Sequence, residues 1–372
     1  MKTVKLGDII KLEYGKPLPS TQRHVGGKYP AYGANGVKAR TDQYLYGQPS
    51  IIVGRKGSAG EITLTDGKFW PLDVTYFVTH DKNETDLLYI YHLFKRLNLP
   101  LLARGVKPGI NRNDIYAIKV ELPSLKEQQQ IVARLDTAFE KISQAEVLMR
   151  QNLNNVAALQ KSILHKYLSA SDSTHTHRLG DLLIIERGGS PRPIKEYLTN
   201  AACGINWIKI GDVSPAAKYI ESTKEKIKPD GLRRSRKVEV GDFVLSNSMS
   251  FGRPYIMKIS GAIHDGWLLL RQKDKTLDKD FLYYFLSSDQ AYSQFDRLAA
   301  GSTVRNLNTQ TVAKVEIHYP KDIEEQRAIA KRLDITFEKI DQTRELYNEK
   351  LRKITNLRHS LLQEAFSTTN AV

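Results

Sequence analysis

The sequence LDTAFEKI at residues 135–142 returns almost unchanged as LDITFEKI at residues 333–340. The similarity continues downstream, where LQKSILHKYLS at 159–169 aligns with LRHSLLQEAFS at 357–367 without a change of spacing. Self-similarity of this kind is the signature of a repeated structural unit. The chain is therefore predicted to contain one segment of shared sequence twice.

The repeat extends upstream as well. LPSLKEQ at 122–128 aligns with YPKDIEEQ at 319–326, and KLGDIIKLEYG at 5–15 aligns with RLGDLLIIERG at 178–188. The sequence between these edges differs in the two copies. Each repeat thus consists of a block of variable sequence followed by the shared segment.

Each shared segment is predicted to form a long helix. It begins just after a proline, contains no further proline or glycine, and starts with the spacing of a capping box, Ser124 with Glu127 and Asp322 with Glu325. Apolar positions then recur at steps of four and three, as in a coiled-coil seam. The seam positions are Ile131, Leu135, Ala138, Ile142, Ala145, Met149, Val156, Leu159 and Ile163 in the first copy, and Ile329, Leu333, Thr336, Ile340, Thr343, Tyr347, Ile354, Leu357 and Leu361 in the second.

The two helices are expected to pack on each other. A helix from Ser124 to Leu168 would be about 65 Å long and would leave its apolar stripe in water if it were alone. An antiparallel coiled coil would bury both stripes and hold one block at each end, related by a pseudo-two-fold axis. Asn152 and Lys350 interrupt the seam at equivalent positions, where each either fixes the register or is solvated.

The repeat also predicts the domain boundaries. The segments are a first block over 1–122, a first helix over 123–170, a polar linker over 171–177, a second block over 178–319, a second helix over 320–367 and a tail over 368–372. Both blocks have mixed α/β patterns, so the fold class is α+β. Strands are predicted over 51–53, 75–78, 118–122, 243–245, 267–270 and 314–319, and helices over 86–98 and 280–295.

Composition and charge narrow the function. The 372 residues carry a net charge of +15, of which the two helical segments hold only +3. The two blocks therefore carry the basic character, which favours a polyanionic partner. No apolar run is long enough to cross a bilayer, the first residues lack a signal-peptide pattern, and Cys203 is the single cysteine. These features predict a cytoplasmic protein without disulfides or a membrane partner.

The blocks share a frame but differ at their loops. SIIVGRKGSAG at 50–60 takes the place of DFVLSNSMSFG at 242–252, and ARGVKPGINRNDI at 103–115 takes that of AAGSTVRNLNTQTV at 299–312. GRKGSAG lacks the Walker spacing for a nucleotide phosphate. Its cations suit guanine edges or DNA phosphates, and its glycines allow close backbone approach. An ordinary glycine turn is the alternative.

Candidate DNA contacts are polar or basic residues in these and neighbouring loops, because Arg and Lys suit guanine or phosphate and Asn suits adenine. They are Tyr32, Asn35, Arg55, Lys56, Ser58, Lys107 and Arg112 in the first block, and Arg192, Asn247, Ser248, Ser250, Arg253, Arg305 and Asn306 in the second. For Tyr32 and Asn35, a packed tyrosine beside an Asn-Gly turn is an equal alternative. His175 and His177 lie in the predicted linker without a nearby Cys/His cluster, so no metal site is expected there.

This organisation resembles the specificity subunit of type I restriction–modification systems. The resemblance covers nearly the whole chain and rests on LPSLKEQ, YPKDIEEQ, the two LD-x2-FEKI stretches and the paired LGD…G edges. It implies that each block is a target-recognition domain reading one half of a bipartite, asymmetric site in double-stranded DNA. It also implies that the helices set the spacing and dock two modification (methyltransferase) subunits, with restriction and translocase subunits in the full complex.

The resemblance further implies a chain without catalysis of its own. S-adenosylmethionine, ATP and Mg²⁺ would belong to partner subunits, so no cofactor is expected here. Residues of the helices would make helix–helix or partner contacts: Ile131, Leu135, Phe139, Ile142, Ile329, Leu333, Phe337 and Ile340.

Two other classes of function are possible for such a chain, an enzyme with an unrecognised active site and a coiled-coil adaptor that binds no DNA. No proline is followed by another, which excludes the Asn/Asp-Pro-Pro-Tyr/Phe motif of an adenine methyltransferase. The acid-x-Lys pattern of a metal-dependent nuclease fails because Gly241 follows Glu239 and Val240. The charge of the two blocks argues against the adaptor.

Overall fold

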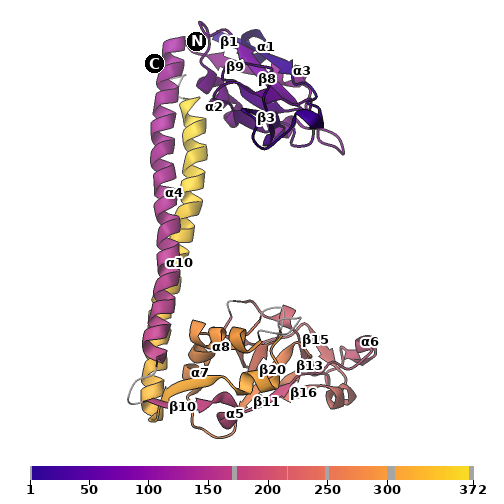
Figure 1. The fold of residues 1–372 in the computed structure, drawn as a ribbon, viewed down its shortest axis with the longest axis vertical. Helices are drawn as coiled ribbons and strands as arrows, with labels where there is room; N and C mark the ends of the chain where they lie inside the picture. The colour runs from indigo at the N-terminus through magenta and orange to yellow at the C-terminus, as the bar shows by residue number, and fades with distance from the viewer. Residues whose placement is uncertain (1, 170–173, 216, 248–250, 300–305, 368–372) are drawn as a thin grey trace. The chain divides into compact units, whose positions relative to one another are not determined.

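The computed structural model describes residues 2–169, 174–215, 217–247, 251–299 and 306–367. It divides into unit 1, residues 1–150 with 348–372, and unit 2, residues 151–347. The two predicted long helices are confirmed as α4 (Leu125–Leu168) and α10 (Ile323–Ala365) (Figure 1). Each long helix contributes one end to each unit.

Unit 1 contains the first block, a mixed α/β fold as predicted. Its elements are β1 (Lys2–Lys5), α1 (Leu6–Ile9), β2 (Ile10–Tyr14), β3 (Tyr29–Gly33), β4 (Gly36–Thr41), β5 (Ile51–Gly54), β6 (Ile62–Leu64), β7 (Trp70–Pro71), β8 (Thr75–His80), α2 (Leu87–Leu97), α3 (Arg112–Tyr116) and β9 (Lys119–Leu122). A four-stranded sheet has the order β2-β8-β5-β6, and a three-stranded sheet has the order β4-β3-β7. Strands β1 and β9 pair separately.

Unit 2 contains the second block. Its elements are β10 (Thr174–Arg178), α5 (Leu179–Leu182), β11 (Leu183–Arg187), α6 (Ile194–Tyr197), β12 (Leu198–Thr199), β13 (Ile205–Ile208), β14 (Tyr219–Ile220), β15 (Glu225–Ile227), β16 (Arg236–Val238), β17 (Phe243–Ser246), β18 (Pro254–Met257), β19 (Gly261–Ile263), β20 (Trp267–Gln272), α7 (Lys279–Leu286), α8 (Asp289–Ala299), α9 (Thr309–Ala313) and β21 (Glu316–Pro320). Two five-stranded sheets have the orders β11-β20-β17-β18-β14 and β12-β15-β13-β19-β16. The β11-β20-β17-β18 series corresponds to β2-β8-β5-β6 of unit 1.

Two predictions about unit 2 are wrong. The polar linker over 171–177 is a strand from Thr174 onward, because β10 pairs antiparallel with β21 over its full length. The helix over 280–295 is two helices, since α7 ends at Leu286 and the Ser288 hydroxyl accepts from the amide of Ala291 at the start of α8. Both errors come from backbone and cap hydrogen bonds that side-chain hydropathy does not encode.

The repeated sequence, LDTAFEKI in α4 and LDITFEKI in α10, packs each long helix against its block. In unit 1, Leu135 is buried in the core, and the Asp136 carboxylate accepts from Nε2 of His92 in α2 at 3.3 Å. Phe139 packs against the same imidazole at a ring-centroid distance of 5.7 Å. Leu135, Asp136 and Phe139 therefore form one contact surface, one helical turn in length.

The second copy makes the same contacts with different partners. Leu333 is buried, Asp334 accepts from the hydroxyl of Tyr284 in α7, and Phe337 lies edge-on to the Tyr284 ring at 5.4 Å. Lys218 adds ion pairs to Asp334 at 3.2 Å and to Asp280 at 2.8 Å. Burial, followed by the bond to Asp334, raises the pKa of Tyr284. His92 and Tyr284 thus occupy the same place in the two repeats.

The helices are antiparallel within each unit. In unit 1, Ser143 of α4 accepts from Arg358 of α10 at 2.9 Å, whereas the earlier Leu135 shares a core with the later Leu362. In unit 2, Gln160 accepts from Arg344 at 2.8 Å, and the later α4 residues lie in one core with the earlier α10 residues. The antiparallel prediction is therefore confirmed separately at both ends of each helix.

The seam follows the prediction near each helix start and departs from it later. Most of the named helix-contact residues are buried within the chain, namely Ile131, Leu135, Ile142, Leu333 and Ile340, whereas Phe139, Ile329 and Phe337 are half-buried. Leu159 and Leu357 are wrong, with 52% and 48% of their area exposed. Gln160 and Arg358, one residue further on, take the inward positions. A period of 3.6 residues drifts away from a strict 3.5-residue seam, which accounts for the shift.

His92 is expected to make the stability of unit 1 sensitive to acid. Burial lowers its pKa from 6.5, and the bond to Asp136 opposes this only in part. The unfolded chain therefore binds more protons below pH 6.5, so this contribution to stability is present above that pH and is lost as the pH falls through the folded pKa. His92→Tyr introduces the residue type found at the equivalent position, Tyr284. It is expected to reduce the decrease in the free energy of unfolding of unit 1 between about pH 7.5 and 5.5. Urea unfolding of both proteins across this range measures it.

His80 sets the limit of that prediction. Burial also lowers its pKa, so part of the acid sensitivity is expected to remain in the variant. Equal pH slopes in wild type and His92→Tyr would show that His92 does not cause the loss.

Candidate nucleic-acid interface

Two loops of the first block are joined by backbone hydrogen bonds. The loop after β5 begins at Arg55, whose amide donates to Val74 at 2.8 Å and whose carbonyl accepts from Ile110 at 3.0 Å. Gly57 donates to Pro108 at 2.9 Å. The segments GRKGSAG and ARGVKPGIN therefore form one surface, which we call loop pair 1 (residues 54–60 and 103–111). The sequence had placed them only as separate candidates.

The second block has equivalent backbone hydrogen bonds at Asn247. The amide of Asn247 donates to Gly266 at 3.0 Å, and its carbonyl accepts from Leu307 at 2.8 Å. Asn247 therefore corresponds to Arg55 and Leu307 to Ile110. We call residues 246–253 and 299–308 loop pair 2. Its residues 248–250 and 300–305, which include the candidates Ser248, Ser250 and Arg305, lie outside the described residues.

The side chains of Arg55 and Asn247 both donate hydrogen bonds to a backbone carbonyl, at equivalent positions of the two blocks. Arg55 donates from Nε and Nη2 to the carbonyl of Asp73 at 3.2 and 2.6 Å, and Asn247 donates from Nδ2 to the carbonyl of Asp265 at 2.7 Å. Asn247 is only 2% exposed. Its burial argues against the predicted DNA contact, because its amide holds the loop and faces the interior.

Burial also argues against a DNA contact for Tyr32. It is 8% exposed and packs edge-on against Phe69 at 5.8 Å, within a cluster that includes Ile52 and Phe77. Burial raises the pKa of its hydroxyl. The packing alternative holds for Tyr32, whereas Asn35 is exposed in the turn between β3 and β4, beside Gly36 with its φ of 106°.

A hollow of about 450 Å³ lies beside loop pair 1. Asn35 and Ser58 line it together with Glu61, Gly57, Gly105 and Pro108, among others. Lys56 and Lys107 are exposed in the same loops. The structure therefore gathers four of the candidates around one surface that offers amide, hydroxyl, carboxylate and ammonium groups, the types that contact base edges.

Sequence reasoning missed Tyr14 at the end of β2. Its ring is 48% exposed, and the guanidinium groups of Arg55 and Arg112 lie 5.4 and 5.1 Å from its centroid. Tyr76 meets the ring edge-on at 5.0 Å. The only sequence signal was a tyrosine beside Gly15 at a repeat edge whose counterpart carries Arg187.

The described candidates of the second block are less closely gathered. Arg192 is exposed and pairs with Asp265 at 3.4 Å, and Arg253 is exposed in loop pair 2. Asn306 is half-buried in the same loop pair. Burial raises the pKa of Asp265, but the hydrogen bond from Ser190 and the nearby positive charges outweigh it, so the carboxyl pKa lies below its usual value.

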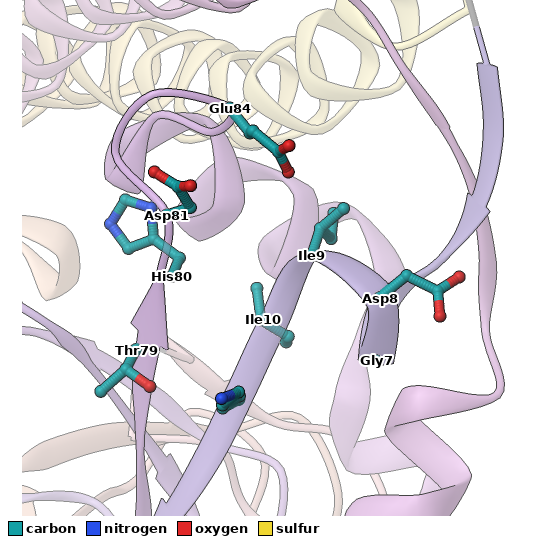
Figure 2. A pocket seen from close by; sticks show the side chains of 9 residues that line it. Gly7, Asp8, Ile9, Ile10, Thr79, His80, Asp81 and Glu84 are labelled. Atoms are coloured by element: carbon teal, nitrogen blue, oxygen red, sulfur yellow. The ribbon is translucent and has the colours of Figure 1, made fainter.

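Another hollow of unit 1, about 370 Å³, is lined by more carboxylates than the hollow beside loop pair 1. Asp8, Asp81 and Glu84 contribute carboxylates to its wall, and Figure 2 shows the Asp8 carboxylate turned away from His80 and Asp81. His80 shares a hydrogen bond with Thr85 at 2.8 Å, and burial lowers its pKa. These three carboxylates outnumber the single ammonium group of the wall, that of Lys11, and they repel phosphates, so this surface does not suit DNA.

Within the described ranges, no group of three or more His, Cys, Asp or Glu side chains could hold a metal ion. His175 and His177 stack on β10, and His177 shares a hydrogen bond with Tyr319 at 3.0 Å. No described helix is long and apolar enough to span a membrane.

Known proteins similar to this chain share its organisation. The family model for the type I restriction modification DNA specificity domain matches residues 1–148 and 172–353. The specificity subunit of the type I restriction enzyme EcoDI from Escherichia coli is 22% identical over 98% of this chain and 87% of its own length. The MjaVIII specificity subunit from Methanocaldococcus jannaschii is 26% identical over 96% and 91%.

Solved structures agree on the fold. A chain from a structure of the assembly and conformational transition of the type I R-M system aligns with a TM-score of 0.77 at 17% identity, covering 98% of this chain and 97% of that chain. The HsdS subunit from Thermoanaerobacter tengcongensis aligns at 0.61 with 18% identity, covering 98% and 96%. The family match comprises two stretches, one for each repeat, and the chain therefore belongs to the type I restriction modification DNA specificity family.

Proposed function

We propose that the chain recognises a bipartite, asymmetric sequence in double-stranded DNA, with one half read by loop pair 1 and the other by loop pair 2. One observation carries this proposal. Equivalent backbone hydrogen bonds are made by Arg55 in loop pair 1 and Asn247 in loop pair 2, while the residue types of the two loop pairs differ. A shared frame with different polar groups suits two readers of two different half-sites.

Charge and similarity support a DNA partner. The blocks hold most of the net charge of +15, and DNA neutralises such surfaces through its phosphates. The relatives named above are specificity subunits of type I restriction enzymes. Two half-sites on one face of B-DNA lie about 34 Å apart or at multiples of that distance, which a fixed spacer between two readers would match.

Two copies of a modification subunit are the partners that we propose for the long helices. Leu148 and Leu346 are exposed at equivalent positions of the two copies, and so are Leu159 and Leu357. Equivalent apolar surfaces on a repeated chain suit two copies of one partner. Catalysis, with S-adenosylmethionine, ATP and Mg²⁺, would then lie in the partner subunits, and this chain would act in the cytoplasm without a cofactor.

A genome-wide map of methylated adenines tests the proposal. Deleting the gene is expected to remove one gapped, asymmetric motif from the map, because that motif needs both readers. Exchanging residues 1–122 for the first block of a relative is expected to change one half of the motif and leave the other intact. Exchanging residues 178–319 is the matched control, which should change the opposite half.

Three results would count against this function. If either exchange altered both halves, the blocks would not read independently. If deletion left the map unchanged although the chain co-purified with a methyltransferase, the chain would not direct methylation. Strand cleavage or methyl transfer by the purified chain alone would favour the enzyme alternative.

A further inference from the structure

Tyr14, Arg55 and Arg112 form a cationic cluster that the sequence did not reveal. The three residues come from the end of β2, the loop after β5 and the start of α3. Both guanidinium groups lie within 5.4 Å of the centroid of the same tyrosine ring. Cation–π contacts of this kind favour arginine over lysine, because the planar guanidinium stacks on the ring.

Within the described part of the chain, the cluster has no carboxylate counter-ion. Among the described residues, neither Arg55 nor Arg112 forms an ion pair with a carboxylate. The guanidinium group of Arg55 donates to the neutral backbone carbonyl of Asp73. Both positive charges lie within 5.4 Å of one ring centroid, and a bound anion would offset the repulsion between them. Because Arg55 is fixed by its carbonyl bonds, part of the entropy cost of binding an anion has already been met.

The second block lacks this cluster. Asn111 and Asn308 cap α3 and α9, so Thr309 stands where Arg112 does. Arg187 takes the place of Tyr14 and the buried Asn247 that of Arg55. The cluster is therefore no part of the shared frame and belongs to the first block alone.

We propose that Tyr14, Arg55 and Arg112 form a phosphate clamp that holds one backbone phosphate of DNA and positions loop pair 1 without reading a base. This inference rests on the proposed DNA recognition. It assigns different contacts to two parts of unit 1. Guanidinium groups on a half-exposed ring suit a phosphodiester, whereas the neutral and acidic groups of the hollow beside loop pair 1 suit base edges.

Arg112→Gln tests the clamp in the full chain with its modification subunits. One phosphate contact contributes about 0.9 to the slope of log affinity against log salt, and about an eightfold gain in affinity at about 0.1 M salt. The variant is therefore expected to bind every duplex five- to tenfold more weakly, roughly, and to lower the salt slope by about one. Arg112→Lys keeps the charge and should restore the slope.

Lys95→Gln is the matched control. It removes one positive charge from the same block, also from a cation that lies on a tyrosine ring, Tyr91 at 5.5 Å, but on α2 rather than in the clamp. It should leave the salt slope unchanged. Thermal unfolding midpoints equal to wild type would show that Arg112→Gln folds normally.

The outcomes separate the clamp from the function on which it rests. Binding is measured to the methylated motif and to duplexes that carry one altered base pair in the first half. Weaker binding with unchanged ratios between these duplexes supports the clamp. A changed ratio at one base pair would make Arg112 a base reader, and unchanged affinity at all salts would remove it from the interface; either result overturns the clamp alone. Wild type without preference among the duplexes would overturn the proposed function.

Discussion

Gln128→Ala is expected to destabilise unit 1 by about 3 kcal/mol, although glutamine is an ordinary surface residue in a helix. The Gln128 side chain is fully buried. Its Oε1 accepts from the amide of Asp86 at 2.9 Å, and its Nε2 donates to the carbonyls of Glu84 and Pro123, each at 3.0 Å. Alanine leaves all three backbone groups without this partner inside the protein, and a buried group that loses its partner costs about 1–3 kcal/mol.

The neighbouring residue provides the control. Gln129 is exposed, so Gln129→Ala should change stability by less than about 0.5 kcal/mol. Because two units rarely unfold as one transition, amide hydrogen exchange read separately in α2 and in α7 is the suitable measurement. Faster exchange in α2 with unchanged exchange in α7 is expected. Equal exchange for the two variants would mean that Gln128 is not the link between α2 and α4.

The second copy explains why this glutamine occurs twice. Gln326 is equally buried, accepts from the amide of Asp278 at 2.8 Å, and donates to the carbonyls of Thr276 and Pro320 at 3.1 and 2.8 Å. Asp86 and Asp278 are the N-caps of α2 and α7. One amide thus ties the start of a long helix to the start of a block helix in each repeat.

The sequence predicted these helices well because their signals are local. Prolines, capping residues and apolar steps lie within a few turns of one another, and Ser124 and Glu127 form the predicted capping box, with the Ser124 amide donating at 2.8 Å. Asp322 caps the second helix by accepting from Glu324 at 2.9 Å. The buried place of Gln128 could not be predicted, because its three partners come from segments that the fold brings together.

The candidate interface was predictable only as a set of loops. Repeat alignment placed the loops in matching positions, and the backbone bonds join them in both blocks. Which side chains face outward depends on distant packing. Tyr32 and Tyr14 both lie near glycines in the sequence, yet Phe69 and Phe77 bury the first, whereas the second remains about half exposed. Hydropathy assigns both tyrosines the same value, so sequence alone could not separate them.

Phe366→Ala, just after the end of α10, is expected to destabilise unit 1 by about 3 kcal/mol. Phe366 is 9% exposed and packs on Tyr89 of α2 at 5.2 Å between ring centroids, and the Arg96 guanidinium lies 5.7 Å from its ring. Leu362, one turn earlier, belongs to the same core. The last turn of α10 and the residue that follows it therefore complete the core of the first block, and alanine at position 366 would leave a cavity there.

Leu168 is the equivalent residue in the other repeat and the matched control. It ends α4 and is buried in the core of unit 2 with Phe281 and Phe285 of α7. Leu168→Ala should therefore accelerate amide exchange in β17 and β20, whereas Phe366→Ala should accelerate it in β5 and β8. Leu357→Ala, at a half-exposed site of α10, should do neither. If both buried variants destabilised the same unit, the end of each long helix would not complete the core of the other block.

This exchange of helix ends also gives a reason for the duplicated sequence. Each copy must supply a helix start that packs on its own block and a helix end that packs on the other block.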